Sequence, residues 1–185
     1  MKDNPITIGF DDATFELKTG LETTQLIGVL CQGIRMIKVV KSEIVIDGND
    51  ATENLIKLVK QNENIQYVFT HTITFAGFNI VDLEEIYLDT GKPIIAVTEK
   101  KVDLDSVIKA LKKKFPSNYH NKIKNIFNAG ELYETDVNTA GGFSKVFFHS
   151  KGLKVAEVEV LLNKINIDSK LPECVRLAHL IGRIF

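Results

Sequence analysis

The chain has 185 residues, 44% of them hydrophobic and 25% charged, which is sufficient for one globular domain, residues 1–185, with a buried core. A formal net charge of −1 favours neither nucleic acid nor membrane surfaces, so any nucleic-acid site has to come from a local cluster of charge. Because the sequence has no signal-like or membrane-spanning apolar run, and because Cys31 and Cys174 fit no metal-ligand spacing, we expect a cytoplasmic protein with reduced thiols.

The first half of the chain alternates apolar runs with helical patterns. Short runs rich in Val, Ile and Phe are typical of strands, and they occur at residues 5–12, 25–32, 34–46, 65–70 and 93–98. Helices are expected at 50–61, which begins with a capping-box pattern, and at 79–90, which ends at Gly91. The first three strands therefore form an antiparallel meander, and the later elements form βαβ units.

The second half is expected to be mainly helical. Pro116 ends one helix, and the polar connection after it is expected to hold a short one. Gly141-Gly142 predicts a turn, followed at 146–148 by a strand or a docked loop. The helical patterns are at residues 104–115, 155–165 and 173–184, and the polar connection that is expected to hold a short helix is at 117–130. This element order predicts an α/β fold of the ribonuclease H-like class, with a mixed sheet flanked by helices.

Acidic residues follow two of the predicted strands. Asp11 and Asp12 close the first strand, and Asp47 and Asp50 follow the third. Since strands one, three and four are parallel in this element order, their carboxyl ends emerge at one edge of the sheet. Carboxylates there could bind Mg²⁺ or Mn²⁺ and support phosphodiester hydrolysis. The alternatives are strand-end turns and, for Asp50, an N-cap. Asp82 is favoured as an acid that complements a helix dipole.

Residues 72–79, after strand four, are apolar and contain a glycine. A loop that exposes aromatic rings beside a strand end is a candidate surface for binding a base. Phe75, Gly77, Phe78 and Asn79 would then contact substrate. Alternatively, the two Phe side chains fill the core, and Gly77 and Asn79 are turn and cap residues.

Histidines and basic residues are the other polar candidates. Arg176, His179 and Arg183 fall at i, i+3 and i+7 on the last helix. This cationic stripe could hold phosphates, with His179 positioned for proton transfer, or could be an exposed helix face. His71, at the end of strand four, could be a metal ligand, a proton-transfer group or a satisfied polar residue. Lysine-rich residues 109–124 could follow a nucleic-acid backbone, although a solvated helix face is favoured.

Four separated blocks resemble a known protein family. They are Ile8-Gly9-Phe10-Asp11-Asp12 and residues 47–52, 72–82 and 171–181. In this order they resemble the archaeal endonuclease dU family, which is related to endonuclease V. The resemblance covers essentially the whole chain. It implies a ribonuclease H-like, endonuclease V-like fold and Mg²⁺-dependent cleavage of DNA near deaminated bases, deoxyuridine in particular, in DNA repair.

The resemblance to endonuclease V also has a gap. Gly9-Phe10-Asp11 is similar to the stretch that carries its strand-one acid, which makes Asp11 the first catalytic candidate. At the end of strand four, where endonuclease V has a second metal-binding Asp, residues 70–72 are Thr, His and Thr. Asp47 or Asp50 would have to replace that ligand, Asp12 would have to serve as the second one, or the protein would bind without cutting.

The leading hypothesis is a metal-dependent endonuclease acting on DNA at deaminated bases. Asp11 and Asp12 would hold the metal, with Asp47 and Asp50 as further ligands or water-positioning groups. His71 and His179 would assist proton transfer, and the loop after strand four would accept or wedge an extruded base. The alternatives are a non-catalytic module that binds modified nucleic acid or nucleotides, and an enzyme acting on a small phosphorylated metabolite. The sequence leaves the oligomeric state open.

Overall fold

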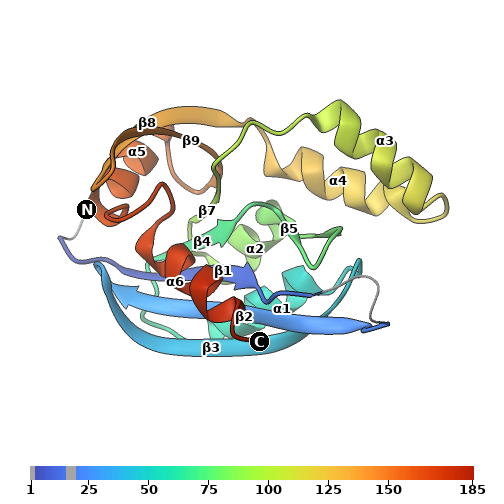
Figure 1. Ribbon diagram of the computed structural model, residues 1–185, viewed down its shortest axis with the longest axis horizontal. Helices are drawn as coiled ribbons and strands as arrows, with labels where there is room; N and C mark the ends of the chain where they lie inside the picture. Colours follow the sequence, from blue (N-terminus) through green and yellow to red (C-terminus); the bar gives the residue numbers. More distant parts are fainter. Residues whose placement is uncertain (1–2, 16–19) are drawn as a thin grey trace.

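The structure is a computed structural model that describes residues 3–15 and 20–185. Within this part of the chain, seven strands form one sheet in the order β3-β2-β1-β4-β7-β9-β8, and two short strands form a separate hairpin (Figure 1). The sheet consists of β1 Ile6–Asp12, β2 Thr23–Gln32, β3 Arg35–Val45, β4 Tyr67–His71, β7 Ile94–Thr98, β8 Tyr133–Thr139 and β9 Gly142–Lys151. The hairpin consists of β5 Thr74–Phe75 and β6 Asn79–Ile80.

The direction of the strands brings three carboxyl ends to one edge. β1 is antiparallel to β2 and parallel to β4, and β4 is parallel to β7. β9 returns antiparallel to β7, and β8 is antiparallel to β9. The mixed sheet predicted from the sequence is therefore confirmed, and the parallel strands β1, β4 and β7 all end at the edge where Asp11 and His71 lie.

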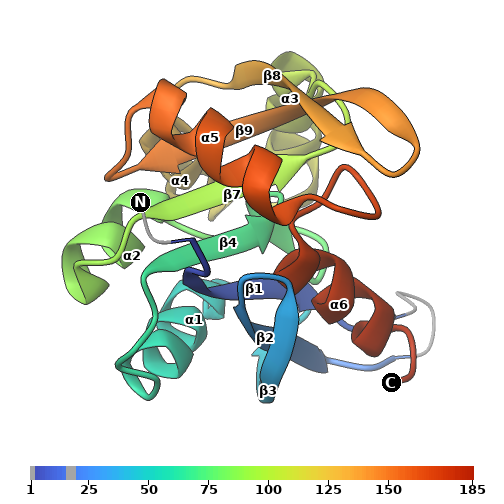
Figure 2. The same cartoon turned by 90° about the vertical axis from the view of Figure 1, so that its left-hand side faces the viewer.

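Alternate side chains of the central strands enter two separate cores. On β7, Ile94 and Ala96 enter one core, and Ile95 and Val97 enter the other, as the period of two in a strand requires. The helices that cover the cores are α1 Ala51–Lys60 and α2 Leu83–Thr90 on the first face, and α5 Val155–Ile165 and α6 Glu173–Gly182 on the second. Figure 2 shows α6 lying across β1 and β2. Among the described residues, no helix combines the length and apolar character needed to cross a bilayer.

Two further helices, α3 Leu104–Lys114 and α4 Tyr119–Ala129, form a hairpin that projects at one end of the molecule (Figure 1). Leu111 and Ile126 join the hairpin to Ile80 in a small apolar cluster of its own. The helix predicted within residues 117–130 is therefore confirmed as α4.

Two predictions about local structure were wrong. The helix expected from residue 79 begins only at Leu83, because Asp82 is its N-cap and accepts a hydrogen bond from the backbone N–H of Glu85 at 3.1 Å. The residues before it form the β5–β6 hairpin instead. Strand β8 was not expected, because Val137 is the single buried side chain in its alternating polar sequence. Pairing with β8 extends β9 well beyond residues 146–148.

Candidate active site

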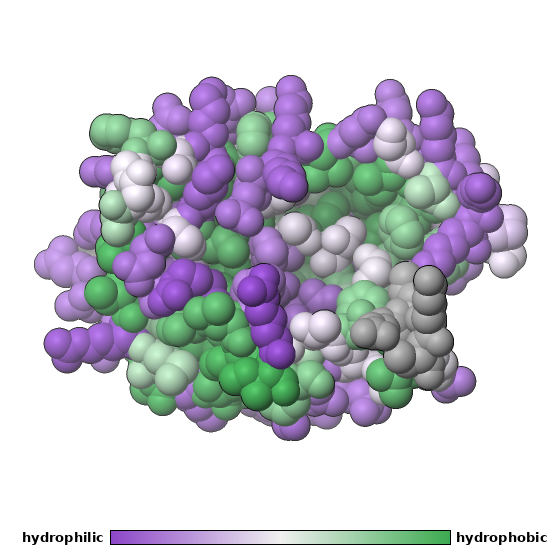
Figure 3. All heavy atoms as spheres, in the orientation of Figure 1, coloured by the Kyte–Doolittle hydropathy of each residue, from purple (hydrophilic) through white to green (hydrophobic). Residues whose placement is uncertain are grey.

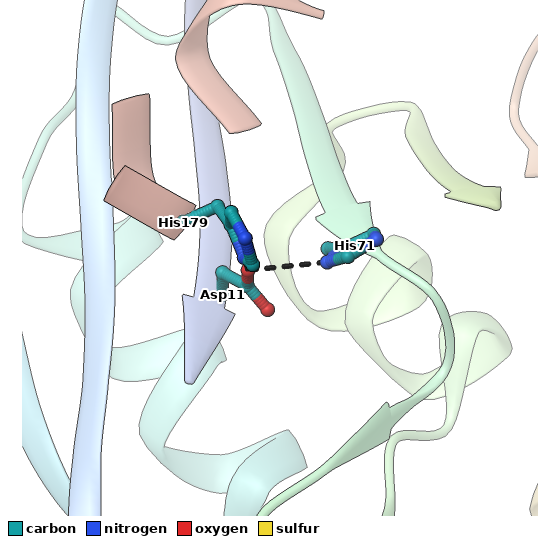
Figure 4. Close-up of side chains that lie close together, drawn as sticks. All are labelled: Asp11, His71 and His179. Atoms are coloured by element: carbon teal, nitrogen blue, oxygen red, sulfur yellow. Dashed lines mark hydrogen bonds and ion pairs between the residues drawn. The ribbon is translucent and has the colours of Figure 1, made fainter. Parts of the chain in front are cut away.

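Three polar side chains from distant segments converge at the carboxyl edge of the sheet. Asp11 is the penultimate residue of β1 and is only 3% exposed, His71 ends β4, and His179 lies on α6. The Oδ2 atom of Asp11 lies 2.7 Å from Nδ1 of His179 and 3.1 Å from Nδ1 of His71. Figure 4 shows both imidazole rings beside this carboxylate. The two rings contact each other edge to face, with centroids 5.6 Å apart.

Strand register and two glycines create this convergence. Phe10 pairs with Thr70 in the parallel β1–β4 ladder, so the next residues, Asp11 and His71, lie side by side. Helix α6 packs directly on the backbone of β1, because a Cβ atom at Gly9 would lie only 2.4 Å from the main chain of α6. At the other end of the contact, a Cβ atom at Gly182 would lie 2.7 Å from the carbonyl oxygen of Asp12. These close approaches place His179 over Asp11.

The carboxylate of Asp11 has three polar contacts. Oδ1 accepts the backbone N–H of Asp12 at 3.0 Å, while both imidazoles share Oδ2. Burial lowers the pKa of His71, but the hydrogen bond to Asp11 and the charges of Asp11, Glu99 and Asp12 outweigh it, so the pKa rises above the usual 6.5. His71 therefore carries more positive charge near neutral pH than a free histidine would.

Asp12 has a different environment from its neighbour. Its Oδ2 accepts the backbone N–H of Ala76, in the loop between β5 and β6, at 2.8 Å. Burial and the nearby charge of Asp11 raise the pKa of Asp12 from 3.8 to about 6. The site thus holds two adjacent acids whose simultaneous ionisation is unfavourable in the absence of a positive charge.

Comparisons with known proteins identify the family. The sequence matches the family described as endonuclease dU over residues 6–185. The chain belongs to the endonuclease dU family. A UPF0215 protein of Methanocaldococcus jannaschii is 37% identical over 189 residues, which cover 100% of this chain and 96% of the relative. The resemblance found in the four sequence blocks is therefore confirmed.

Solved structures place this endonuclease dU family member in a wider fold group. A protein of unknown function from Archaeoglobus fulgidus DSM 4304 has a TM-score of 0.83 and 29% identity, with 96% of each chain covered. Endonuclease V of Ciona intestinalis, in complex with a 24mer DNA containing an inosine followed by a ribo-adenosine, has a TM-score of 0.57 at 11% identity, covering 95% of this chain and 83% of that one. The predicted endonuclease V-like fold is confirmed, and family and fold together indicate a nuclease.

The donor set at the site fits a divalent cation. Asp11, His71 and His179 each offer one ligand atom, and these atoms all lie within 4.8 Å of one another. Mg²⁺ prefers oxygen ligands, whereas imidazole nitrogens are typical ligands of transition metals. Of the two ions expected from the sequence, Mn²⁺ therefore suits these residues better than Mg²⁺. The sequence indicated these residues by their positions at strand ends and on the last helix. His71 was open there as a metal ligand, although the leading hypothesis gave both histidines proton transfer.

The other two predicted metal ligands are not brought to this cluster. Asp47 accepts the backbone N–H of Phe78 at 2.9 Å and pairs with the ammonium group of Lys114 at 2.5 Å. Oδ1 of Asp50 accepts the side-chain amide of Asn79 at 2.6 Å, and the same carboxylate accepts the backbone N–H of Val45 at 3.2 Å. Both carboxylates are bound by donors of their own surroundings, so they hold loops together instead of facing Asp11.

The predicted substrate-binding loop divides into core and surface residues. Phe75 and Asn79 are 0% exposed, and the side-chain oxygen of Asn79 accepts the backbone N–H of Ala51. These two residues are therefore structural, as the alternative interpretation held. Gly77 and Phe78 instead line an apolar cavity beside the site.

The two arginines of the predicted stripe also differ in whether they reach the site. Arg176 is held by Glu173, with nitrogen–oxygen distances of 2.8 and 2.6 Å. Arg183, at the end of α6, lines the same surface hollow as Asp11, Asp12, His71 and His179. Of the stripe, only His179 and Arg183 therefore reach the site.

One candidate residue was missed by the sequence analysis. His149, on β9, lines the apolar cavity beside Gly77 and Phe78. It was missed because the predicted strand covered only residues 146–148, and nothing in its local sequence indicated a cavity. Thr72, which follows His71 directly and lines the same cavity, has a left-handed backbone with φ of 64°. That conformation is unfavourable for a β-branched residue and is characteristic of functional sites.

Proposed function

We propose that this member of the endonuclease dU family is a metal-dependent endonuclease that cleaves DNA beside a deaminated base, deoxyuridine in the first place, as part of DNA repair. The observation that carries the proposal is the convergence of His71 and His179 on the carboxylate of Asp11. The family and the endonuclease V-like fold support nuclease chemistry. The DNA bound to endonuclease V of Ciona intestinalis contains inosine, a nucleoside with a deaminated base, which supports DNA as the partner.

Asp11, His71 and His179 would hold the cation, Mn²⁺ or Mg²⁺, with Asp12 beside them. Once bound, such an ion polarises a phosphate group and lowers the pKa of a coordinated water. The burial and mutual repulsion that raise the pKa of Asp12 make a positive charge favourable at this point. The ligand set therefore agrees with the electrostatics of the two acids.

Other side chains around the hollow suit the remaining tasks. Asp12 keeps one oxygen on the N–H of Ala76 and has a pKa of about 6, so it would accept a proton from the attacking water. Arg183, which is exposed on the same hollow, would bind a phosphate oxygen. In this proposal Asp12 and the two histidines exchange the roles that the sequence analysis gave them.

The apolar cavity would receive the extruded base. Enzymes that act on one base of a DNA strand rotate it out of the stack into a pocket. Thr72 lines the cavity and directly follows His71, so the cavity and the metal cluster meet at the end of β4. A base in the cavity would thus leave its backbone near Asp11, with Phe78 available for contact with the ring.

The test is nicking of end-labelled DNA that contains a single deoxyuridine, with Mn²⁺, with Mg²⁺ and with EDTA. We expect metal-dependent nicking that is reduced at least about 100-fold in Asp11→Asn. Asp136→Asn, which changes an exposed acid on the edge strand β8, should nick like the wild type. Undiminished nicking by Asp11→Asn would show that the cluster of Asp11, His71 and His179 is not the nuclease active site.

A non-catalytic module that binds modified nucleic acid is the second candidate function. The observation that favours it is the end of β4, where residues 70–72 provide no carboxylate. This candidate predicts binding that weakens with salt and no metal-dependent nicking. The same DNA, tested for binding and for cleavage in parallel, distinguishes the two functions.

A further inference from the structure

A cavity of about 370 Å³ lies between the loop after β4, the end of β7, the α3–α4 hairpin and β9. This volume is within the range of small-molecule pockets, about 300–1,000 Å³. Figure 3 shows apolar residues gathered in the hollow beneath α3. The polar side chains on the wall are those of Thr72, Thr74, Thr98, Glu131 and His149. An apolar wall with few polar groups is typical of a pocket that orients a flat ring by one or two hydrogen bonds.

His149 has a fixed tautomer. Its side chain is buried, and Nδ1 lies 3.1 Å from the carbonyl oxygen of Gly130 and 3.0 Å from that of Glu131. Since a carbonyl oxygen can only accept a hydrogen bond, Nδ1 must carry the proton. Burial lowers the pKa of His149, so the ring is neutral at pH 7 and Nε2 keeps its lone pair. Among the described residues, Nε2 has no hydrogen-bond partner.

The threonine hydroxyls on the same wall are already engaged. The hydroxyl of Thr72 donates to the carbonyl oxygen of Thr74 at 3.1 Å, and that of Thr98 donates to the carbonyl oxygen of Lys100 at 3.2 Å. Their donors are therefore used within the protein. Nε2 of His149 is therefore an acceptor with a defined tautomer, on a residue that lines this wall.

Deamination changes the ring nitrogen of a base from an acceptor into a donor. N3 of cytosine accepts a hydrogen bond, whereas N3 of uracil carries a hydrogen; N1 of adenine and of hypoxanthine differ in the same way. We propose that Nε2 of His149 accepts a hydrogen bond from this N–H group and so selects deaminated bases in the cavity. The inference rests on the proposed function, because it assumes that the cavity receives the extruded base.

The selectivity follows from the fixed tautomer. A parent base would place its own lone pair against that of Nε2, which leaves two buried acceptors unpaired. A deaminated base forms the hydrogen bond instead. We expect a preference of about tenfold or more, since one such bond is worth roughly a factor of ten. Thymine also carries a hydrogen at N3, so this contact distinguishes uracil from cytosine but not from thymine.

The test uses single-stranded oligonucleotides that are identical except for one residue, deoxyuridine, N3-methyl-deoxyuridine or deoxycytidine. Dissociation constants are measured by fluorescence anisotropy in EDTA, and nicking rates are measured with Mn²⁺. His149→Asn keeps an amide donor for the carbonyls of Gly130 and Glu131 but removes Nε2. The control is Asp136→Asn, at an exposed position on the edge strand β8.

The wild type and the control should bind and nick the deoxyuridine strand about tenfold better than the other two, and His149→Asn should reduce this difference to within about threefold. A natively folded His149→Asn protein that keeps the wild-type preference for deoxyuridine over deoxycytidine would overturn the inference and leave the proposed nuclease intact. So would equal wild-type affinity for the deoxyuridine and N3-methyl strands, a result that needs no variant. Wild-type protein that neither binds nor nicks deoxyuridine DNA would reject the proposed function, and the role of His149 with it.

Discussion

Asp11, near the end of β1, and the acids after β3 differ in the groups that bind their carboxylates. Oδ2 of Asp11 accepts from two histidine side chains beside an open hollow. Asp47 and Asp50 accept backbone N–H groups of Phe78 and Val45. An imidazole side chain can rotate toward a cation, whereas a backbone N–H keeps the position that the fold gives it. The groups around a carboxylate, and not its position at a strand end, therefore decide whether it is available for chemistry.

Asp47 and Asp50 form a structural group of acids, and a buried lysine supports the loops that they hold together. The ammonium group of Lys122, a residue 1% exposed, shares its three N–H donors among four oxygens. These are the carbonyl oxygens of Asp47, Gly48 and Phe78 at 3.0, 2.6 and 2.7 Å, and the side-chain oxygen of Asn49 at 3.0 Å. Lys122 therefore ties the loop after β3 and the β5–β6 hairpin to α4. Among the described residues, none of the side chains that line the active-site hollow contacts the ammonium group of Lys122.

The largest expected effect on stability comes from removing the ammonium group of Lys122, which supports the structural group. Lys122→Met should lower the free energy of unfolding by about 3 kcal/mol, because buried carbonyl oxygens lose their donor. Guanidinium unfolding measures it, with Lys124→Met, an exposed position on the same helix, as the control expected to change by less than about 0.5 kcal/mol. Equal stability of the two variants would show that the lysine does not hold the loops together.

A second prediction concerns the metal. His179→Ala should weaken Mn²⁺ binding, measured by calorimetry on the protein alone, by about 10- to 100-fold. Asp50→Asn should leave the Mn²⁺ affinity within about twofold, because Asp50 is bound to Val45 and Asn79. His120→Ala is the matched control for histidine removal. The division between the two groups of acids would be wrong if Asp50→Asn weakened Mn²⁺ binding as much as His179→Ala.

The sequence was sufficient for most of the fold, because apolar runs and helix boundaries are local signals. It was insufficient for β8, where only Val137 is buried and the strand depends on pairing with β9. The start of α2 was also misplaced, because the side chain of Asn79 is used to bridge Ala51, Val45 and Asp50. These hydrogen bonds join segments far apart in the chain, so the local sequence does not reveal them.

The same limit applies to the site. Asp11 and His71 could be identified as candidates because topology places strand ends together, and His179 because it belongs to the cationic stripe of the last helix. The family resemblance put Asp11 first among the acids, but the sequence could not exclude Asp47 and Asp50 as ligands, because the groups that bind them, such as the N–H of Phe78, come from remote residues. It also gave no indication of His149, whose tautomer depends on the carbonyls of the loop before β8.

The smallest expected effect belongs to Asp12, which shares features of both groups of acids. Its Oδ2 accepts a backbone N–H from Ala76, as in the structural group, but it also lies beside Asp11. Because its pKa is raised from 3.8 to about 6, the folded state binds more protons than the unfolded state between these pH values. The contribution of Asp12 to stability is therefore full below pH 3.8 and is lost as the pH rises toward 6.

Asp12→Asn, which keeps an oxygen for the N–H of Ala76, removes this dependence. Relative to the wild type, the free energy of unfolding of the variant should rise by about 2 kcal/mol between pH 4 and pH 6 and level off above about pH 7. Urea unfolding at a series of pH values measures the difference, with Asp136→Asn as the control. A difference that shrinks as the pH rises would mean that the Ala76 N–H governs Asp12 more than burial and Asp11 do, and would assign Asp12 to the structural acids.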